Sequence, residues 1–481
     1  MYSHSEELGE RNESAFFAKL DEIAAEIKKK DDFVVVFHYD ADGCASGAIA
    51  VKALEREGKK VATLCLKQLY KENIPQITAL GKNYLFVDFG SGQLDYLKQE
   101  FGDNFFILDH HQPCLADGKI VEHKFHANPL LFGINGGTEL SGAGVTFFFA
   151  RALNEKNNDL SMLAIVGACG DMQESRGALE GLNRKIMQIA EQEKLLSVKK
   201  DLRLFGRISR PLVSFLCFSS NPILPELTAN EENCVAFIKG LGIPLKDSFT
   251  ERYLSYEDLS LDQKRALSSA LIMHLSNYGV EEWKIKELIG EVYTLEKEKE
   301  KSPLRDAKEF ATALNSAGRH KQPNVALNVC MGDRNPSGEY GNIIALLDEH
   351  RAALRNGIEF IHTHGIEERK TFYFFDAKDQ IEESLVGIIA GMLYGSVIQE
   401  NKPIIALAQN SDGTIKASGR GTSALLRRGL NIGKALKEIG LVLPGVEGGG
   451  HKIAAGAKIP SDKIEEFLEL LEKKFEEQLK S

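Results

Sequence analysis

Residues 31–43 read DDFVVVFHYDADG, and this stretch decides the fold class. The apolar run from Phe33 to Phe37 is short and rich in β-branched side chains, which is typical of a central strand buried on both faces of a parallel sheet. Gly43 then permits a tight turn, and the segment 44–58 has the composition of a helix. The stretch therefore predicts a strand, a turn and a helix at the start of an α/β domain.

Strand and helix patterns continue to alternate beyond this stretch. Further strands are predicted at 59–66, 83–90 and 104–111, and helices at 141–153 and 161–171. This alternation predicts a doubly wound parallel sheet, in which ligands bind beyond the carboxyl ends of the strands. Three of the predicted strands end there in Asp or His, so we expect a functional site at that edge.

The chain has 481 residues, too many for one ordinary core, and two or three domains are expected. The pattern divides it into an α/β catalytic domain at 1–190, a mostly helical insert at 191–300, connector helices at 301–355 and a smaller α/β domain at 356–481. A long helix is predicted at 339–356. The last part has predicted strands at 357–365, 371–377, 403–409 and 414–420, the last two joined by a hairpin turn at 411–413, and an apolar helix at 383–398.

The composition is that of an ordinary globular protein, with 43% hydrophobic and 27% charged residues. No apolar run reaches the roughly 18 to 20 residues of a membrane span, and the polar stretch 1–14 does not resemble a signal peptide, so we expect a cytoplasmic protein without membrane contact. Seven cysteines without a C-x-x-C pair disfavour both a disulfide framework and a zinc–thiolate site. The net charge of −10 argues against tight, sequence-independent coating of a duplex, and any basic groove must be local.

His38, Asp40 and Asp42 alternate along the chain, so we expect them to share one side of the strand's end. Carboxylates suit hard cations such as Mn²⁺ and Mg²⁺, and Mn²⁺ also accepts imidazole. The structural alternative is that these aspartates only cap the following helix, because Asp is a common N-cap. The motif alone does not decide between the two interpretations.

Three more segments bring acids or histidines to the same predicted edge. Asp88 ends one strand, Asp109, His110 and His111 end another, and Asp171 closes the small-residue run G-A-C-G-D. A strand-end turn could explain Asp88 and a helix C-cap Asp171, but two adjacent histidines after an acid are hard to explain by packing. Two cations about 3.5–4 Å apart, the spacing of two-metal phosphoester hydrolysis, need about as many ligands as these segments offer, with Asp88 as the bridge. The predicted ligands are His38, Asp40, Asp42, Asp88, His110 and Asp171.

These four motifs, in this order over roughly the first 180 residues, resemble those of the DHH phosphoesterases. The resemblance implies two Mn²⁺ ions, with Mg²⁺ as an alternative. It implies that His38 and Asp40 hold the first ion, that Asp42, His110 and Asp171 hold the second, and that Asp88 is shared. It also implies that Asp109 supports the ligands by hydrogen bonding and that His111 meets the scissile phosphate, so that Asp88, Asp109 and His111 form the catalytic set.

The C-terminal part resembles the DHH-associated domain. The resemblance lies in the run Gly448, Gly449 and Gly450, followed by His451 and by the small residues 454–456. Exposed N–H groups of such a glycine-rich loop can cradle phosphate, and Arg420 could grip a phosphate with both arms of its guanidinium. The structural alternative is a plain glycine turn between strands.

The segment LNSAGR at 314–319 resembles a segment of RecJ-type exonucleases, in which Asn315 and Arg319 would touch the nucleic-acid backbone or its terminus. The structural alternative is a helix that ends near Gly318. The chain's length is similar to that of archaeal RecJ-like exonucleases, which act in DNA replication and repair and include members that associate with the GINS complex. His362 and His364 alternate on a predicted strand and could bind a metal, but packing is the favoured interpretation.

Three hypotheses follow. The first is a Mn²⁺-dependent exonuclease that hydrolyses the phosphodiester bonds of single-stranded DNA or RNA. The second keeps this chemistry but takes small substrates, such as very short oligonucleotides or cyclic dinucleotides. The third is a largely non-catalytic replisome subunit, which is disfavoured because every metal ligand of the motifs is present. Cleavage polarity, sugar preference and oligomeric state stay open.

Overall fold

The computed structural model describes residues 11–479 except 117–118, 220–221 and 396. The expectation about a signal peptide therefore falls largely outside the described residues. The chain divides into two compact units, the first made of the chain up to Ser209 with Lys286–Leu347, and the second of Arg210–Ile285 with the chain from Asp348 onward. The four domain boundaries expected from the sequence stay a prediction.

A five-stranded parallel sheet organises the first unit. Its strands lie in the order β2-β1-β3-β4-β7, and every neighbouring pair is parallel. The strands are β1 Asp32–His38, β2 Lys60–Leu66, β3 Tyr84–Val87, β4 Phe105–Leu108 and β7 His126–Ala127. This order confirms the predicted doubly wound sheet, and its topological switch point lies between β1 and β3, where such folds bind ligands.

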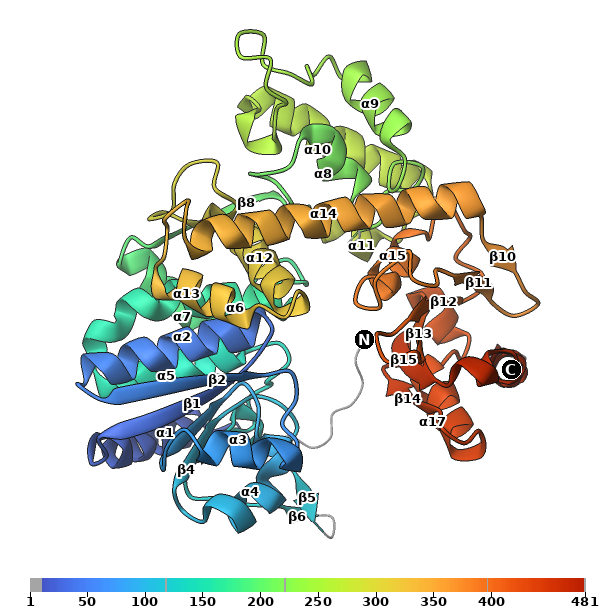
Figure 1. Ribbon diagram of the computed structural model, residues 1–481. Helices are drawn as coiled ribbons and strands as arrows, with labels where there is room; N and C mark the ends of the chain where they lie inside the picture. The colour runs from blue at the N-terminus through green and yellow to red at the C-terminus, as the bar shows by residue number, and fades with distance from the viewer. Residues whose placement is uncertain (1–10, 117–118, 220–221, 396, 480–481) are drawn as a thin grey trace. The chain divides into compact units, whose positions relative to one another are not determined.

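The side chains of β1 explain why the sheet is covered on both faces. Phe33, Val35 and Phe37 pack into the larger core, whereas Val34 and Val36 pack into a smaller one on the opposite face. The larger core holds helices α1 Glu13–Lys28, α2 Ala41–Arg56, α5 Gly142–Leu153 and α6 Ser161–Gly170, and the smaller one α3 Ile74–Thr78 and α4 Leu94–Phe101 (Figure 1). Truncating a buried phenylalanine such as Phe37 to alanine would cost about 3–5 kcal/mol.

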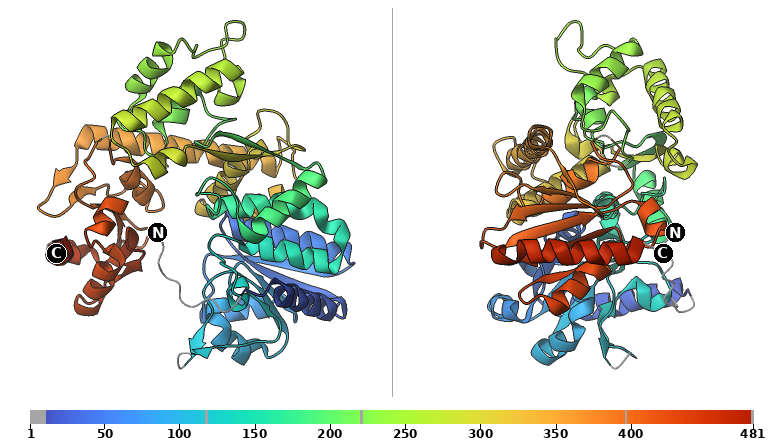
Figure 2. Two further views of the ribbon diagram at one scale, coloured as in Figure 1. Left: turned by 180° about the vertical axis from the view of Figure 1, so that it is seen from behind. Right: turned by 90° about the vertical axis from the view of Figure 1, so that its right-hand side faces the viewer.

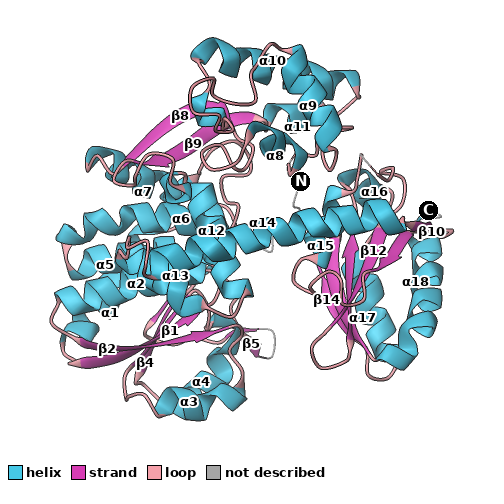
Figure 3. Ribbon diagram, turned by 45° about the horizontal axis from the view of Figure 1, so that its top comes forward, coloured by secondary structure: helices cyan, strands magenta, loops and turns pink. Residues whose placement is uncertain are grey.

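The rest of the first unit packs against this layered core. It comprises α7 Gly181–Gln192, β8 Leu196–Leu202, β9 Ile289–Leu295, α12 Ala307–Arg319, α13 Pro323–Met331, the start of α14 Glu339–His364 and the short pair β5 Leu115–Ala116 and β6 Lys119–Ile120. The segment 191–300 was expected to be mostly helical, but β8 and β9 form an antiparallel two-stranded ribbon (Figure 3). The sequence concealed this ribbon because its strands are far apart in the chain and β8 carries exposed lysines.

The second unit combines a group of helices with a six-stranded mixed sheet. The helices from the insert are α8 Leu212–Cys217, α9 Glu231–Gly240, α10 Leu261–Asn277 and α11 Glu282–Lys286. The sheet has the order β10-β11-β12-β13-β15-β14, from β10 Glu367–Glu368, β11 Tyr373–Asp376, β12 Ile404–Gln409, β13 Ile415–Arg420, β14 Glu447–Gly450 and β15 Ala454–Ile459. The predicted hairpin between β12 and β13 is confirmed.

Helices cover both faces of this sheet. The helices of the final part are α15 Val386–Met392, α16 Ser423–Arg427, α17 Ile432–Val442 and α18 Ile464–Leu479. Side chains of α17 and α18 form the core on one face, where α18 lies across the strands (Figure 2, right). The core on the other face contains α15 and the end of α14.

The predicted strand 357–365 was wrong, because these residues complete the long helix α14. Gly357 suggested a break, but it is a packing glycine, since a Cβ there would lie 2.3 Å from Ile389 Cδ1. His362 consequently sits on a helix, where its Nε2 contacts the carbonyl oxygen of Ala229 at 2.9 Å. His364 contacts the carbonyl of Phe360 on its own helix. The two histidines therefore do not form the strand pair that could have bound a metal.

Two further features bear on the class of protein. None of the described helices is both long enough and apolar enough to cross a bilayer. The cysteines are all free, and five of them are buried.

Candidate metal centre

Side chains from five segments of the first unit converge at the carboxyl edge of its sheet. His38 is the last residue of β1, Asp88 follows β3, and the Asp109–His111 segment follows β4. Asp171 follows α6, Asp40 lies between β1 and α2, and Asp42 lies in the first turn of α2. Because β1, β3 and β4 are adjacent and parallel, their ends necessarily meet at one edge.

The converging groups form two trios, the first of His38, Asp40 and Asp88 and the second of Asp42, His110 and Asp171, and Asp88 also reaches the second. In the first, His38 Nδ1 lies 3.0 Å from Asp40 Oδ2 and 3.4 Å from Asp88 Oδ2. In the second, His110 Nε2 lies 3.2 Å from Asp88 Oδ1, 3.3 Å from Asp171 Oδ2 and 3.6 Å from Asp42 Oδ2. The two carboxylate oxygens of Asp88 thus face different histidines, the arrangement expected of a bridging ligand.

The HYDADG motif reaches the site by a different route from the one its alternation suggested. Only His38 belongs to the strand, whereas Asp40 caps α2 by accepting a hydrogen bond from the N–H of Gly43 at 2.9 Å, and Asp42 lies in the first turn of that helix. A Cβ at Gly43 would lie 2.3 Å from the carbonyl oxygen of His38. The helix cap and the candidate ligand are therefore compatible roles of the same residue, Asp40.

Asp42 and Asp88 are held by close backbone approaches. The carboxylate of Asp42 accepts hydrogen bonds from the N–H groups of Gly142 and Ala143, at 2.6 and 3.0 Å, at the N-terminus of α5. Asp88 has a φ of 62°, in the left-handed region that Asp tolerates better than most residues. A Cβ at Gly142 would lie 2.5 Å from Asp88 Oδ1, and one at Gly167 2.2 Å from Asp42 Oδ1. Both acids therefore depend on glycines of the covering helices.

Four polar atoms at the centre are buried without a hydrogen bond among the described residues. They are Nδ1 of His38, Nε2 of His110 and both side-chain oxygens of Asp88. Buried polar atoms nearly always have a hydrogen-bond partner. Four such atoms gathered at one centre without a partner therefore indicate a binding site for another group. Imidazole nitrogens and carboxylate oxygens with free lone pairs are ligands of divalent cations such as Mn²⁺. The donor set therefore fits two such ions.

The electrostatics point the same way. Burial alone would lower the pKa of His38, but the carboxylates of Asp40 and Asp88 outweigh it and raise the pKa to about 11. Burial would also lower the pKa of His110, but the carboxylates of Asp88 and Asp171 outweigh it and raise this pKa. Burial, helped by neighbouring carboxylates, raises the pKa of Asp171 to about 7. Without cations, the crowded acids are thus compensated by protons, which divalent ions would replace.

Asp109 is fully buried and organises the turn that carries both histidines. Its carboxylate accepts hydrogen bonds from the N–H groups of Ser91, His110 and His111, at 2.9, 2.7 and 3.2 Å, and from His111 Nδ1 at 2.9 Å. The nearby histidine charge lowers the pKa of Asp109 although burial opposes it. Burial would lower the pKa of His111, but the carboxylate of Asp109 outweighs it and raises this pKa to about 9. The half-exposed His111 ring is therefore aligned by Asp109.

The sequence did not reveal a second layer of residues behind this turn. The side chain of Asn128 donates hydrogen bonds to the carbonyl of His111 at 2.7 Å and to Ser91 Oγ at 2.9 Å. The Ser91 hydroxyl then donates to His126 Nε2 at 2.8 Å, which fits a neutral ring because burial lowers the pKa of His126 to about 4. His126 and Asn128 reach this turn because β7 lies beside β4, so predicting that strand pairing would have identified them.

A similar support lies behind His110. Its Nδ1 donates to the carbonyl oxygen of Gly136 at 2.7 Å, and Gln173 Nε2 donates to the same oxygen at 2.8 Å. The amide of Asn183 donates in turn to Gln173 Oε1. This series of hydrogen bonds fixes the tautomer that leaves His110 Nε2 free to face the carboxylates.

The LNSAGR segment packs against the metal-centre turn within the same unit. Asn315, on α12, accepts a hydrogen bond from the N–H of Ala41 at 2.9 Å, and a Cβ at Gly318 would lie 2.2 Å from the carbonyl oxygen of Tyr39. Burial lowers the pKa of Arg319, with Tyr39 acting in the opposite sense. Among the described residues, the structure records no ion pair for this guanidinium. Arg319 is thus a half-buried cation beside the centre that lacks an anion.

The remaining predicted residues lie in the second unit. Gly448, Gly449 and Gly450 form the edge strand β14 rather than the expected loop, and β14 pairs with β15 on one side. Arg420 ends β13 opposite Ala454, and the N–H of His451 donates to the carbonyl of Ala454 at 2.9 Å, so Arg420 and His451 share one end of the sheet. Burial lowers the pKa of Arg420.

The chain matches three family models. They are described as the DHH family, N-terminal domain, over residues 32–169, the DHH-CID domain over 204–289 and the DHHA1 domain over 370–477. The chain is 31% identical over 455 residues to the uncharacterized protein MJ0831 of Methanocaldococcus jannaschii, covering 93% of this chain and 94% of that protein. It is also 37% identical over 89 residues to the single-stranded-DNA-specific exonuclease RecJ of Escherichia coli, an alignment covering 18% of this chain and 14% of RecJ.

Two solved structures share the fold at low identity. RecJ from Thermus thermophilus in complex with Mn²⁺ superposes with a TM-score of 0.57 at 18% identity, and the alignment covers 95% of this chain and 55% of that one. CDC45 from Entamoeba histolytica superposes with a TM-score of 0.64 at 15% identity, covering 96% and 99% of the two chains. The three family models, in one chain that matches its archaeal relative over nearly the whole length, establish that this protein belongs to the DHH family.

Proposed function

We propose that this protein is a phosphodiesterase that holds two divalent cations, preferentially Mn²⁺ with Mg²⁺ as the alternative, and cuts single-stranded nucleic acid from an end. His38 and Asp40 would hold one ion and Asp42, His110 and Asp171 the other, with Asp88 shared. One observation carries the proposal: both oxygens of Asp88 are buried without a hydrogen bond to any described residue, and each faces the histidine of a different trio.

Bound divalent cations would polarise the scissile phosphoryl group and supply a nucleophile at neutral pH. The chain's own contribution is positioning. Asp109 accepts the Nδ1 proton of His111, which leaves Nε2 of this half-exposed ring for the scissile phosphate. The raised pKa of His111, about 9, favours a proton on Nε2 that can be donated to a phosphate oxygen.

Single-stranded nucleic acid is the proposed substrate because RecJ of Escherichia coli, which carries the matched segment, is named as specific for single-stranded DNA. Arg319 supports this choice, since a backbone phosphate would provide the anion that the half-buried guanidinium lacks. The free amide hydrogens of Asn315 could donate to the same backbone. In the second unit, Arg420, His451 and the edge strand Gly448–Gly450 would bind phosphate through a guanidinium, an imidazole and unpaired N–H groups.

Two alternatives compete with this proposal. A small-substrate phosphodiesterase would use the same metal centre, and only substrate length separates it from the exonuclease. A CDC45-like replisome subunit is favoured by the fold likeness to CDC45, and association with the GINS complex would accompany it. The complete set of six ligand residues supports the enzyme over this non-catalytic role.

Digestion of 5′- and 3′-labelled single strands of DNA and RNA, from dinucleotides to long oligomers, tests the proposal with Mn²⁺, Mg²⁺ or chelator. Stepwise shortening of long strands from one end, dependent on the metal and lost in Asp88→Asn, is the expected result. Arg319→Ala, Arg420→Ala and His451→Ala should raise KM without lowering metal uptake. Activity confined to dinucleotides would favour the small-substrate alternative, and an inert protein that captures GINS would favour the replisome role.

A further inference from the structure

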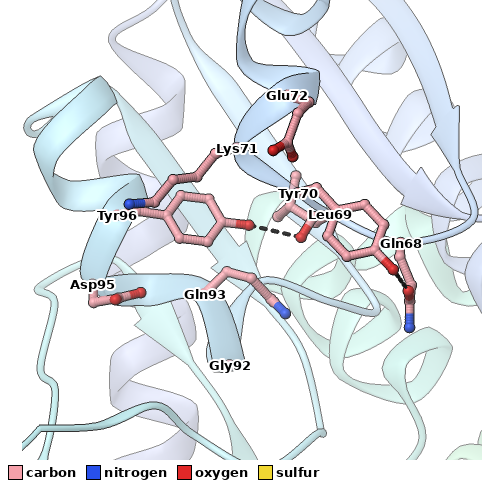
Figure 4. A pocket seen from close by; sticks show the side chains of 9 residues that line it. All are labelled: Gln68, Leu69, Tyr70, Lys71, Glu72, Gly92, Gln93, Asp95 and Tyr96. Carbon is pink, nitrogen blue, oxygen red and sulfur yellow. Dashed lines mark hydrogen bonds between the residues drawn. The ribbon is translucent and has the colours of Figure 1, made fainter. Parts of the chain in front are cut away.

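An open pocket of about 480 Å³ lies at the carboxyl edge of the parallel sheet, outside the metal centre. One wall is the segment that follows β2, and the other is the turn and helix that follow β3 (Figure 4). The lining side chains that carry the argument are Gln68, Tyr70, Lys71, Gln93 and Tyr96. The volume falls within the roughly 300–1,000 Å³ of ordinary small-molecule sites.

The pocket borders the metal centre along the chain and in space. Gly92, which lines it, follows the candidate bridging ligand Asp88 by four positions, and a Cβ at Gly92 would lie 3.6 Å from the carbonyl oxygen of Gln112, the residue after His111. On the other side, the ammonium group of Lys67 lies 6.0 Å from the ring of Tyr39, the neighbour of His38. A strand bound at the metals would therefore pass beside this pocket.

The charge of the pocket disfavours a phosphate group. Among the described residues that line it, Lys71 is the one cation, whereas Glu72 and Asp95 are acidic, and all three side chains are exposed. Lys71 is moreover placed over the ring of Tyr96, with Nζ 5.6 Å from the ring centroid. A single cation shared with an aromatic face and outnumbered by carboxylates is a poor anion site.

The aromatic and amide groups instead fit an uncharged, flat, polar-edged ligand. Tyr70 is 56% exposed, unusual for a large aromatic residue, and its hydroxyl donates to the side-chain oxygen of Gln68. Tyr96 is fixed by a 2.7 Å hydrogen bond to the carbonyl of Leu69, so the two rings lie on either side of that carbonyl, with Gln93 next to them (Figure 4). The amide of Gln93 makes no hydrogen bond within the described part of the chain, which leaves it for the edge of a base.

We propose that this pocket binds a nucleobase of the substrate strand, at a position flanking the scissile phosphate, by stacking on Tyr70 and hydrogen bonding to Gln93. This inference rests on the proposed action on single strands. Stacking on one aromatic side chain tolerates every base because each has a π-face, whereas an amide can donate to or accept from a base edge. The subsite therefore adds affinity for polymers without strict sequence preference.

The test steps one abasic nucleotide along a labelled oligodeoxythymidylate and measures KM for Mn²⁺-dependent cleavage by the full chain. The wild type should show a raised KM when the abasic position reaches the pocket. Tyr70→Ala should raise KM for the intact strand by roughly 5- to 150-fold, the effect of losing one stacked base, and should remove the penalty at that abasic position alone.

Two further variants separate stacking from a general effect. Tyr70→Phe keeps the ring and should behave as the wild type, whereas Gln93→Ala should raise KM less than Tyr70→Ala does. Tyr253→Ala removes an equally exposed tyrosine of the second unit, 55% exposed, and serves as the matched control. An abasic profile identical in wild type and Tyr70→Ala would overturn the base subsite while leaving the exonuclease standing. Failure of the wild type to cleave any strand would overturn both.

Discussion

Asp88→Asn should remove the stabilisation that Mn²⁺ gives to the first unit, because each side-chain oxygen of Asp88 serves a different trio. At free Mn²⁺ about 100 times the Kd, each ion stabilises the folded state by about 2.7 kcal/mol. For a domain of this order of size, that shift is about 5–10 °C in Tm per ion. Losing a residue that merely orients a ligand weakens metal affinity about 10- to 100-fold. Losing a shared ligand should therefore cost about 100-fold at both sites, which removes most of the shift.

Calorimetric scans of chelator-treated protein, titrated with MnCl₂, measure this effect directly. Asp171→Asn touches only the second trio, so about half of the wild-type shift should remain, and metal analysis should find one ion instead of two. Asp21→Asn removes an exposed carboxylate of α1 and is the matched control, expected to behave as the wild type. Equal losses in Asp88→Asn and Asp171→Asn would refute the bridging role, and an unaltered shift in Asp88→Asn would refute the site.

Three more outcomes are expected. Gly167→Ala places a Cβ 2.2 Å from the present position of Asp42 Oδ1, so Mn²⁺ affinity should fall by at least about tenfold with the circular dichroism spectrum unchanged; intact affinity would show that the carboxylate is not a ligand. Gln173→Leu removes the second donor to the Gly136 carbonyl and should lower Mn²⁺ affinity about 10- to 100-fold, whereas a change in KM alone would contradict a role behind His110. In chelator-treated protein, the raised pKa of His111 contributes stability that is complete below about pH 6.5 and is lost as the pH rises through about 9. The Tm should therefore fall across this pH range, and it should fall less with Mn²⁺ bound. A Tm that rises with pH would contradict the assignment.

The parallel sheet explains how much of the site was readable from the sequence. His38, Asp88 and Asp109 each follow an apolar run, and parallel strands bring such residues to one edge whatever their separation in the chain. Asp42 was also found, but for the wrong reason, because a helix turn and not strand alternation directs it inward. The pattern therefore predicted side chains that the structure brings together at one edge, and it misjudged the local backbone that carries them.

The residues that were missed act through the backbone. Asn128 and Gln173 contact carbonyl oxygens of His111 and Gly136, and a carbonyl has no side-chain signature to announce its partner. The ribbon of β8 and β9 was missed for a related reason, since its pairing joins segments whose separation no local periodicity encodes. Gly357 misled in the opposite direction, because a glycine required by packing against Ile389 looks the same in sequence as one that ends a helix.

The energetic cost of gathering these side chains argues that they have a function. Each buried polar atom without a partner costs about 1–3 kcal/mol, and four such atoms gather at Asp88, His38 and His110. The left-handed backbone of Asp88 adds strain of the kind that accumulates at functional sites. A chain that needed only the fold could relieve these costs by replacing Asp88 with an apolar residue, since the surrounding β3 and β4 are fully buried. The chain nevertheless carries the acid, both histidines and the glycines that admit them. These residues suit a centre whose stability is restored when cations bind. This is the reason to favour an enzyme over an inert subunit of the same fold.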